Sequence, residues 1–307
     1  MAWRCDGLRW DGGGPVLRWR RSGGPGGERG GERGGERRES VLVYGRDLGF
    51  RAVGARGCVG ARGNVCPLGA VVPGRSTGGR CGECARLERA HSVAADTLAD
   101  DPRTYRVYLA WFGPGMVKVG ITAEQRGSAR LLEQGAVAFS WLGRGPLMAA
   151  RRTEELVRRG LGVPDRVPYA AKRAVRYALP GAVERAAQVE RLHARAAALE
   201  GWPQSLERLA FGAVDHVGVF GLERTDTAAV SGVVGELVDG GSVAGRLVAA
   251  AGPDLHLAPA GDEREVVVLD TRLMSGWELV EGGGADAVTV PVVEVRGAGG
   301  DVQDGLF

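Results

Sequence analysis

The side chains best suited to chemistry lie within residues 105–135. This segment holds a tyrosine, a lysine and an arginine at Tyr108, Lys118 and Arg130. Two runs of alternating apolar residues flank a turn at residues 113–115, which predicts a β-hairpin with a three-residue loop, followed by a helix. A phenol, an ammonium and a guanidinium gathered on one small sheet can bind and polarise a phosphodiester. An ordinary hairpin packed on a helix would use the same residues.

The length of the loop sets the register of this hairpin. The expected opposite pairs are Phe112 with Met116, Ala110 with Lys118, Tyr108 with Gly120, and Arg106 with Thr122. Residues directly opposite one another share a face of the sheet, so we expect one polar face and one core face. The polar face would bear Arg106, Tyr108, Lys118, Gly120 and Thr122. Because glycine has no side chain, we expect the Tyr108 ring beside Gly120 to be uncovered.

The order of these motifs resembles the GIY-YIG endonuclease core over residues 105–160. The matching features are Tyr108, the run Val117–Thr122, an arginine in the next helix and a glutamate in a later helix. The chain is more closely similar to a bacterial family catalogued as a domain of unknown function, which joins such a core to a cysteine cluster. The motifs shared with that family are Lys118–Thr122, Arg130 and Gln134-Gly135-Ala136.

The resemblance implies three catalytic positions, and Lys118, which departs from the superfamily pattern, is a fourth candidate. Tyr108 would act as a base or orient water, and Arg130 would stabilise charge on the phosphorus. Glu154 would hold a divalent metal such as Mg²⁺, so the chemistry would be metal-assisted hydrolysis. Lys118 stands where the superfamily has its second tyrosine and would neutralise charge. It is one of two lysines in a chain whose lysines and arginines number 40, so it is unusual in its own right.

Departures from the superfamily pattern count against cleavage. Arg106 replaces the glycine of the first motif, and a longer spacing makes Arg126 a rival of Arg130. The arginines expected to contact DNA or RNA phosphates are Arg106, Arg126, Arg151, Arg152 and Arg158. Pairing of arginine with glutamate along one helix is the alternative for those after residue 150. We expect a nucleic-acid-binding protein that no longer cleaves. An active metal-dependent endonuclease and a protein-interaction scaffold are the alternatives, so whether the chain is an enzyme is open.

Four of the five cysteines are close together in the sequence. They are Cys58, Cys66, Cys81 and Cys84, with the spacing C-x7-C-x14-C-x2-C. The final C-x2-C pair is typical of two thiolates that share one tetrahedral metal. The spacing predicts a structural zinc site, although the first gap is wider than in common zinc motifs. Reduced packing cysteines or a redox pair are the alternatives, and His91 is a spare ligand.

The apolar patterns predict an α+β fold with three kinds of module. A small three-stranded antiparallel sheet with flanking helices, similar to the GIY-YIG core, is accompanied by the cysteine (zinc) module and a β-rich barrel or sandwich domain. The expected parts are residues 1–57, 58–102, 103–204 and 205–307. The central part should run strand 105–112, strand 116–122, helix 124–134, strand 136–142 and helix 147–160, with a further helix at 182–200.

The two ends of the chain have similar β-like patterns. Short apolar runs recur from Val214–Phe220 to Val288–Val295, separated by glycine-rich turns. The N-terminal strands are expected to complete the same sheet. Residues 22–40 contain three copies of Gly-Gly-Glu-Arg and are expected to be a disordered loop.

Composition excludes few classes of function. The net charge is only +3, so the chain as a whole is no strong polyanion binder, and 44% hydrophobic content is enough for real cores. No apolar run approaches the ~20 residues that span a membrane, and the N-terminus lacks the apolar stretch of a signal peptide. We therefore expect a cytoplasmic protein without a membrane partner. The excess of arginine over lysine is typical of a GC-rich bacterial genome. The sequence predicts no oligomeric state.

Overall fold

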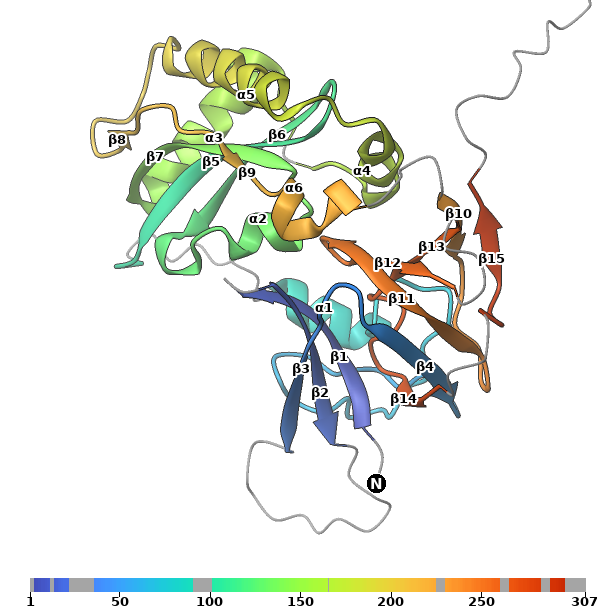
Figure 1. Cartoon of the computed structure of the whole chain (residues 1–307). Helices are drawn as coiled ribbons and strands as arrows, with labels where there is room; N and C mark the ends of the chain where they lie inside the picture. Colours follow the sequence, from blue (N-terminus) through green and yellow to red (C-terminus); the bar gives the residue numbers. More distant parts are fainter. Residues whose placement is uncertain are drawn as a thin grey trace, which may run out of the picture.

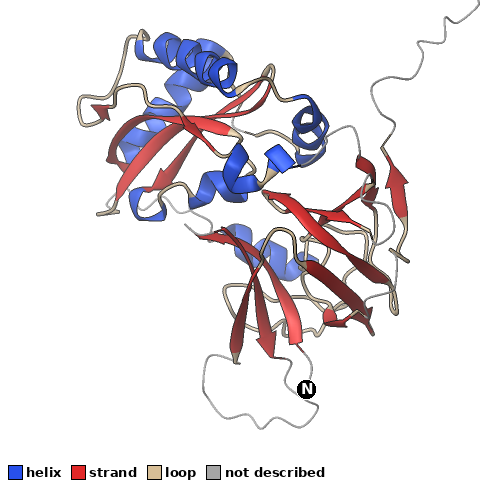
Figure 2. Ribbon diagram, in the orientation of Figure 1, coloured by secondary structure: helices blue, strands red, loops and turns tan. Residues whose placement is uncertain are grey.

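The chain folds as a mixed α+β protein around two sheets (Figures 1 and 2). A computed structural model describes residues 3–11, 14–21, 36–90, 101–164, 166–224, 230–259, 265–282 and 288–295. The predicted disordered loop falls mostly in residues 22–35, which lie outside the described residues, as do His91 and the C-terminal tail after residue 295.

The larger sheet is built from both ends of the chain. Its N-terminal strands are β1 (Trp3–Asp11), β2 (Gly14–Arg21), β3 (Arg37–Val41) and β4 (Asp47–Val53). Its C-terminal strands are β10 (Val230–Val234), β11 (Ser242–Ala251), β12 (Asp254–Ala258), β13 (Val266–Asp270), β14 (Glu278–Glu281) and β15 (Val292–Glu294). Strands β4 and β1 pair with β11 and β14, so segments far apart in sequence lie side by side.

The strand order shows that this sheet is open. The order is β15-β10-β13-β12-β11-β4-β14-β1-β2-β3, and only β10 and β13 run parallel. Within the described residues the edge strands β15 and β3 do not pair with one another, so the barrel alternative of the predicted barrel or sandwich is wrong. Strands β12 and β13 are buried along their whole length. Burial on both faces explains the continuous apolar run of β13, whereas β12 also buries Asp254 and His256.

The smaller sheet forms an α/β module above the larger one in Figure 1. Its elements are β5 (Thr104–Gly113), β6 (Met116–Ala123), the 3₁₀ helix η1 (Glu124–Arg126), α2 (Ala129–Glu133), β7 (Ala138–Pro146), α3 (Leu147–Leu161), α4 (Tyr169–Val175), η2 (Arg176–Ala178) and α5 (Ala182–Ala197). Strand β5 lies between β6 and β7 in an antiparallel arrangement. The short strands β8 (Glu207–Arg208) and β9 (Val214–Asp215) add to β7.

Both faces of this small sheet are covered. Helices α3 and α5 pack on one face, around a core that includes Val107, Leu109 and Val157. Helix α2 contributes Leu131 to a separate core on the other face, together with Tyr108. The strands therefore occupy the middle layer of a three-layer module, with the side chains of the predicted polar face inside it.

Three local predictions differ from the structure. The expected helix 124–134 is interrupted at Gly127, whose φ of 48° ends η1 before α2 begins. Val214–Phe220 is not one strand, because the Asp215 carboxylate accepts a hydrogen bond from the Val217 N–H and starts helix α6 (Val217–Phe220). The end of the expected loop is strand β3, which ion pairs such as Arg18–Glu39 hold against β2.

Candidate functional site

The hairpin β5–β6 has the register expected from its loop. Tyr108 lies opposite Gly120, Ala110 opposite Lys118, and Arg106 opposite Thr122. The pairing next to the turn is different, because the register shifts after Trp111 and Met116 then lies opposite Gly113 rather than Phe112. The shift is confined to the turn, so the predicted set of residues that share a face with Tyr108 is confirmed.

Tyr108 is not uncovered, and the expectation of an open ring is wrong. The residue is 2% exposed, and its hydroxyl lies so close over Gly120 that a Cβ there would overlap it. The amide of Gln134 donates a hydrogen bond of 3.0 Å to the hydroxyl. Burial raises the pKa of Tyr108 above its ordinary value. The missing side chain of Gly120 makes room for the phenol to pack under α2, instead of leaving it open to solvent.

Charged side chains lie near this buried phenol. After burial and the Gln134 hydrogen bond, the charges of Arg130, Glu154 and Arg126 act on the Tyr108 pKa, so three of the residues that sequence analysis singled out lie close enough to influence one hydroxyl. Both arginines are exposed and converge on Glu133, which terminates α2: Arg126 is 2.8 Å and Arg130 3.8 Å from its carboxylate. Arg126 and Arg130, which the order of motifs singled out as rivals, thus contact the same carboxylate.

An arginine from the larger sheet joins the same carboxylate. Arg9 of β1 lies 3.5 Å from Glu133. Three guanidinium groups therefore share a single carboxylate, and the side chains of the arginines are 44% to 52% exposed, whereas that of Glu133 is 13% exposed. Sequence reasoning missed Arg9, because no local pattern reveals that β1 packs against α2.

The two lysines of the chain lie near one another. Burial, followed by the charge of Lys118, lowers the pKa of Lys172 to about 7. Lys172 is 3% exposed; its ammonium donates a 3.0 Å hydrogen bond to the Gln134 carbonyl and lies 4.0 Å from the centre of the Phe112 ring. The charge of Arg130 acts on the same ammonium. Lys118, which is partly buried, lies opposite Ala110 and therefore shares the sheet face of Tyr108.

The other predicted phosphate contacts are more dispersed. Arg106 pairs with Glu124 at 2.7 Å and its guanidinium lies over the Trp141 ring. Arg158 pairs with Glu155 within α3 at 2.7 Å, which is the pairing along one helix that was the alternative to phosphate contact. The charge of Arg151 acts on Tyr105, which belongs to the core on the opposite face from Tyr108. Arg152 is exposed on α3.

A buried ionic network joins the α/β module to the larger sheet. Arg173 of α4 contacts Asp254 at 2.6 Å and Asp270 at 3.1 Å, and Arg176 contacts Asp254 at 3.1 Å. Both carboxylates are almost fully buried, and Arg272 pairs with Asp270 from the other side. The partners are far apart in sequence, so no local pattern announced the network. It attaches α4 and η2 to strands β12 and β13.

The four cysteines of the predicted metal site converge. The Sγ atoms of Cys58, Cys66, Cys81 and Cys84 all lie within 4.8 Å of one another, and those of Cys66 and Cys81 are 3.8 Å apart. A tetrahedral zinc with Zn–S bonds of about 2.3 Å separates its sulfurs by roughly 3.8 Å. The donor set and its dimensions therefore fit a single metal ion such as zinc.

Backbone donors prepare the sulfurs for this role. The Cys58 Sγ accepts hydrogen bonds from the N–H groups of Gly60 and Cys81. The Ala70 N–H lowers the pKa of Cys66 to about 6, whereas burial raises that of Cys84 to about 12. A bound cation would stabilise all four as thiolates.

Local structure brings the distant cysteine pairs together. Gly60 has a φ of 77°, and a Cβ there would overlap the Asn64 carbonyl, so only glycine allows the loop to fold back. Helix α1 (Gly82–Ala90) carries Cys84 in its first turn. The buried Arg56 guanidinium fastens the loop to the larger sheet. Its hydrogen bonds, of 2.6–3.0 Å, go to the carbonyls of Pro73, Ser76, Arg272 and Ser275.

The described residues contain one further predicted metal ligand, Glu154. The four cysteines are the group of metal-binding side chains found close together in the described ranges, and Glu154 is not part of such a group. Mg²⁺ at Glu154 stays a prediction. No helix in the described ranges is long and apolar enough to span a lipid bilayer.

The fold and site define a mixed α+β protein with a four-cysteine cluster and a basic group around a buried tyrosine. The sequence matches the family described as Protein of unknown function (DUF2797) over residues 45–279, and the chain belongs to that family. The expected resemblance to a family of unknown function is confirmed at this level. No curated protein and no solved structure matches the sequence.

Proposed function

We propose that the chain binds nucleic acid through the basic cluster, which we define as Arg9, Lys118, Arg126 and Arg130, and that it does not cleave what it binds. The observation that carries the proposal is the sharing of Glu133 by three exposed arginines. One carboxylate balances one of the three guanidinium charges, so two positive charges remain on this surface. Guanidinium groups in such surplus are suited to contact phosphate oxygens.

The resemblance to the GIY-YIG core supports the same surface. Tyr108 and Lys118 share a sheet face in the register of the two motifs, and the charges of Arg130 and Glu154 act on the Tyr108 hydroxyl. In a divergent core of this kind, the side chains that once positioned a phosphodiester would still bind one.

The position of Tyr108 argues against cleavage. A base or a water-orienting group must reach the scissile phosphate or its water. The Tyr108 hydroxyl is buried, accepts a hydrogen bond from Gln134 and has a raised pKa, so it is held as a neutral phenol. Lys118 in place of the second tyrosine supplies charge without a hydroxyl.

The four-cysteine cluster supports a separate role for zinc. We infer that one Zn²⁺ is held by Cys58, Cys66, Cys81 and Cys84, because four sulfurs at these distances complete a tetrahedral shell with no position left for substrate. When bound, the ion would stabilise the loop between β4 and α1. Metal analysis of purified protein should then give one zinc per chain, and a metal-free folded protein would contradict the assignment.

The binding proposal is tested with labelled DNA and RNA, single-stranded and duplex, in the presence and absence of Mg²⁺. We expect binding at low salt without cleavage, and the variant Glu154→Gln should bind as the unchanged protein does. Cleavage that needs Mg²⁺ and disappears in Glu154→Gln would instead establish an endonuclease. Absence of binding to every probe at low salt would overturn the proposal.

A further inference from the structure

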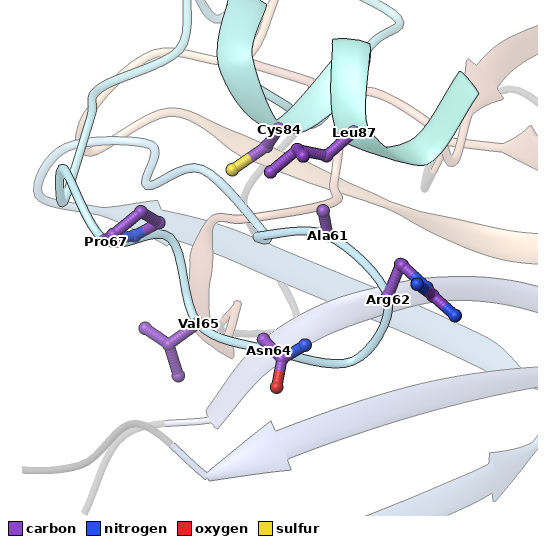
Figure 3. Close-up of a pocket in the computed structure, with 7 residues that line it drawn as sticks. All are labelled: Ala61, Arg62, Asn64, Val65, Pro67, Cys84 and Leu87. Atoms are coloured by element: carbon purple, nitrogen blue, oxygen red, sulfur yellow. The ribbon is translucent and has the colours of Figure 1, made fainter. Parts of the chain in front are cut away.

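A cavity of about 370 Å³ opens on the cysteine module (Figure 3). It is lined by Ala61, Arg62, Asn64, Val65, Pro67, Cys84 and Leu87. Figure 3 shows Cys84 and Leu87 projecting from α1, with Ala61 and then the loop that carries Asn64 and Val65 below them. The walls are mostly apolar, and Val65 is 80% exposed. An exposed apolar wall beside an amide suits a flat, partly polar ligand.

A second cavity, of about 290 Å³, adjoins the first. Three arginines from β1 and β2, Arg4, Arg20 and Arg21, line it, together with Cys5, Gly57, Cys58, Val59, Val65 and Gly276. No aspartate or glutamate belongs to this lining. Because Val65 lines both cavities, the apolar cavity and the arginine cavity share a wall.

The carboxylates that pair with Arg20 and Arg21 lie at the surface. Arg20 is 3.3 Å from Asp6, whose side chain is 40% exposed, and Arg21 is 2.8 Å from Glu36, whose side chain is 60% exposed. Exposed ion pairs of this kind contribute little energy and exchange readily for a better anion. A zinc ion held by four thiolates would carry a net negative charge, which part of this arginine charge offsets. Neutralising the zinc site needs only the arginines and gives no role to the adjoining apolar cavity.

We propose that the two cavities together bind one nucleotide of a single-stranded nucleic acid. The base occupies the apolar cavity between Val65 and Leu87, where the Asn64 amide can donate to and accept from its edge. The adjoining phosphate lies in the arginine cavity. A base paired within a duplex is stacked on its neighbours and cannot enter, so this site selects unpaired strands.

This inference rests on the proposed nucleic-acid binding and extends it to a second contact, on the cysteine module. The basic cluster would hold phosphates of either strand form, whereas the nucleotide site would discriminate between forms. The preference for single strands is therefore the property that separates the two contacts in an experiment.

The test uses the full zinc-loaded chain and fluorescent ten-residue oligonucleotides, single-stranded and duplex, read by anisotropy. Val65→Asp places a carboxylate at the wall shared by both cavities. It should weaken single-strand binding by about tenfold, which corresponds to losing one bound base, and leave duplex binding unchanged. The matched control is Val71→Asp, because Val71 is 67% exposed in the same module and lines neither cavity.

The outcomes distinguish failure of the nucleotide site from failure of the proposed nucleic-acid binding. Zinc content and thermal melting of both variants should equal those of the unchanged protein, and Arg4→Gln, which alters the arginine cavity alone, should weaken single-strand binding independently. If Val65→Asp and Arg4→Gln both bind single strands normally, the nucleotide site is refuted, although binding by the basic cluster stands. If the unchanged protein binds no oligonucleotide, both proposals fail. An equal loss in Val65→Asp and Val71→Asp would also refute the site.

Discussion

Replacing Arg126 and Arg130 together by glutamine should reduce the salt dependence of nucleic-acid binding. Both guanidinium groups are exposed and lie beside Glu133, 2.8 Å and 3.8 Å from its carboxylate. Each phosphate contact adds about 0.7 to the slope of log affinity against log salt for a single strand. Two lost contacts lower the slope by about 1.4, so the loss of affinity between about 50 and 200 mM salt shrinks about sevenfold.

The assay is anisotropy titration of a labelled single strand at several salt concentrations. The control is the double variant Arg191→Gln, Arg195→Gln, which removes the same charge from exposed positions on α5. Helix α5 covers the face of the small sheet opposite to α2, so these changes should leave the slope nearly unaltered. An equal fall in slope for both double variants would refute the reasoning, because overall charge rather than the basic cluster would then govern binding.

Three further outcomes follow from buried groups. Tyr108→Phe should cost about 1 kcal/mol of stability in urea denaturation, since one neutral hydrogen bond is lost, and should leave binding unchanged; a loss of binding with normal stability would contradict the buried role. Burial lowers the pKa of His256 from 6.5 to about 3. As the pH is lowered between these values, the unfolded chain takes up a proton that the folded chain does not. The free energy of unfolding should therefore decrease by up to about 1.4 kcal/mol for each unit by which the pH falls. This slope should be smaller in His256→Gln, measured by denaturation at several pH values. Removal of metal by a chelator should lower the melting temperature of the unchanged protein, and a Cys84→Ser variant should melt low without the chelator; equal melting before and after chelation would contradict the folding role of zinc.

Local rules were sufficient for the hairpin and for most of the elements around it. The three-residue loop and the alternation of apolar residues gave the pairing of Tyr108 with Gly120 and of Ala110 with Lys118. Helices α3 and α5 follow from apolar spacing along the chain. The convergence of the cysteines followed from their types and from the C-x2-C pair, even across the wide gap between Cys58 and Cys66.

Contacts between distant segments were beyond these rules. The burial of Tyr108 depends on packing by α2 and by Val167, which follows much later in the chain. The place of Arg9 beside Glu133 depends on how β1 meets α2. The buried pairs of Arg173 and Arg176 with Asp254 join segments about eighty residues apart. The periodicity of a single sequence predicts local elements but not which distant segments will contact one another.

The attachment of β1 to β14 has a consequence for the family region of the chain. The match covers residues 45–279, so it contains β4 and the start of β14 but not the three strands β1–β3. Here β1 pairs with the start of β14 through Arg4 and Glu278, the Cys5 N–H donates to the Trp277 carbonyl, and the Gly276 N–H donates to the Cys5 carbonyl. An N-terminal hairpin placed in this way shields a border whose amides would otherwise invite another chain to add a strand. A shortened protein that starts at residue 45 would expose the edge of β14 and become prone to self-association.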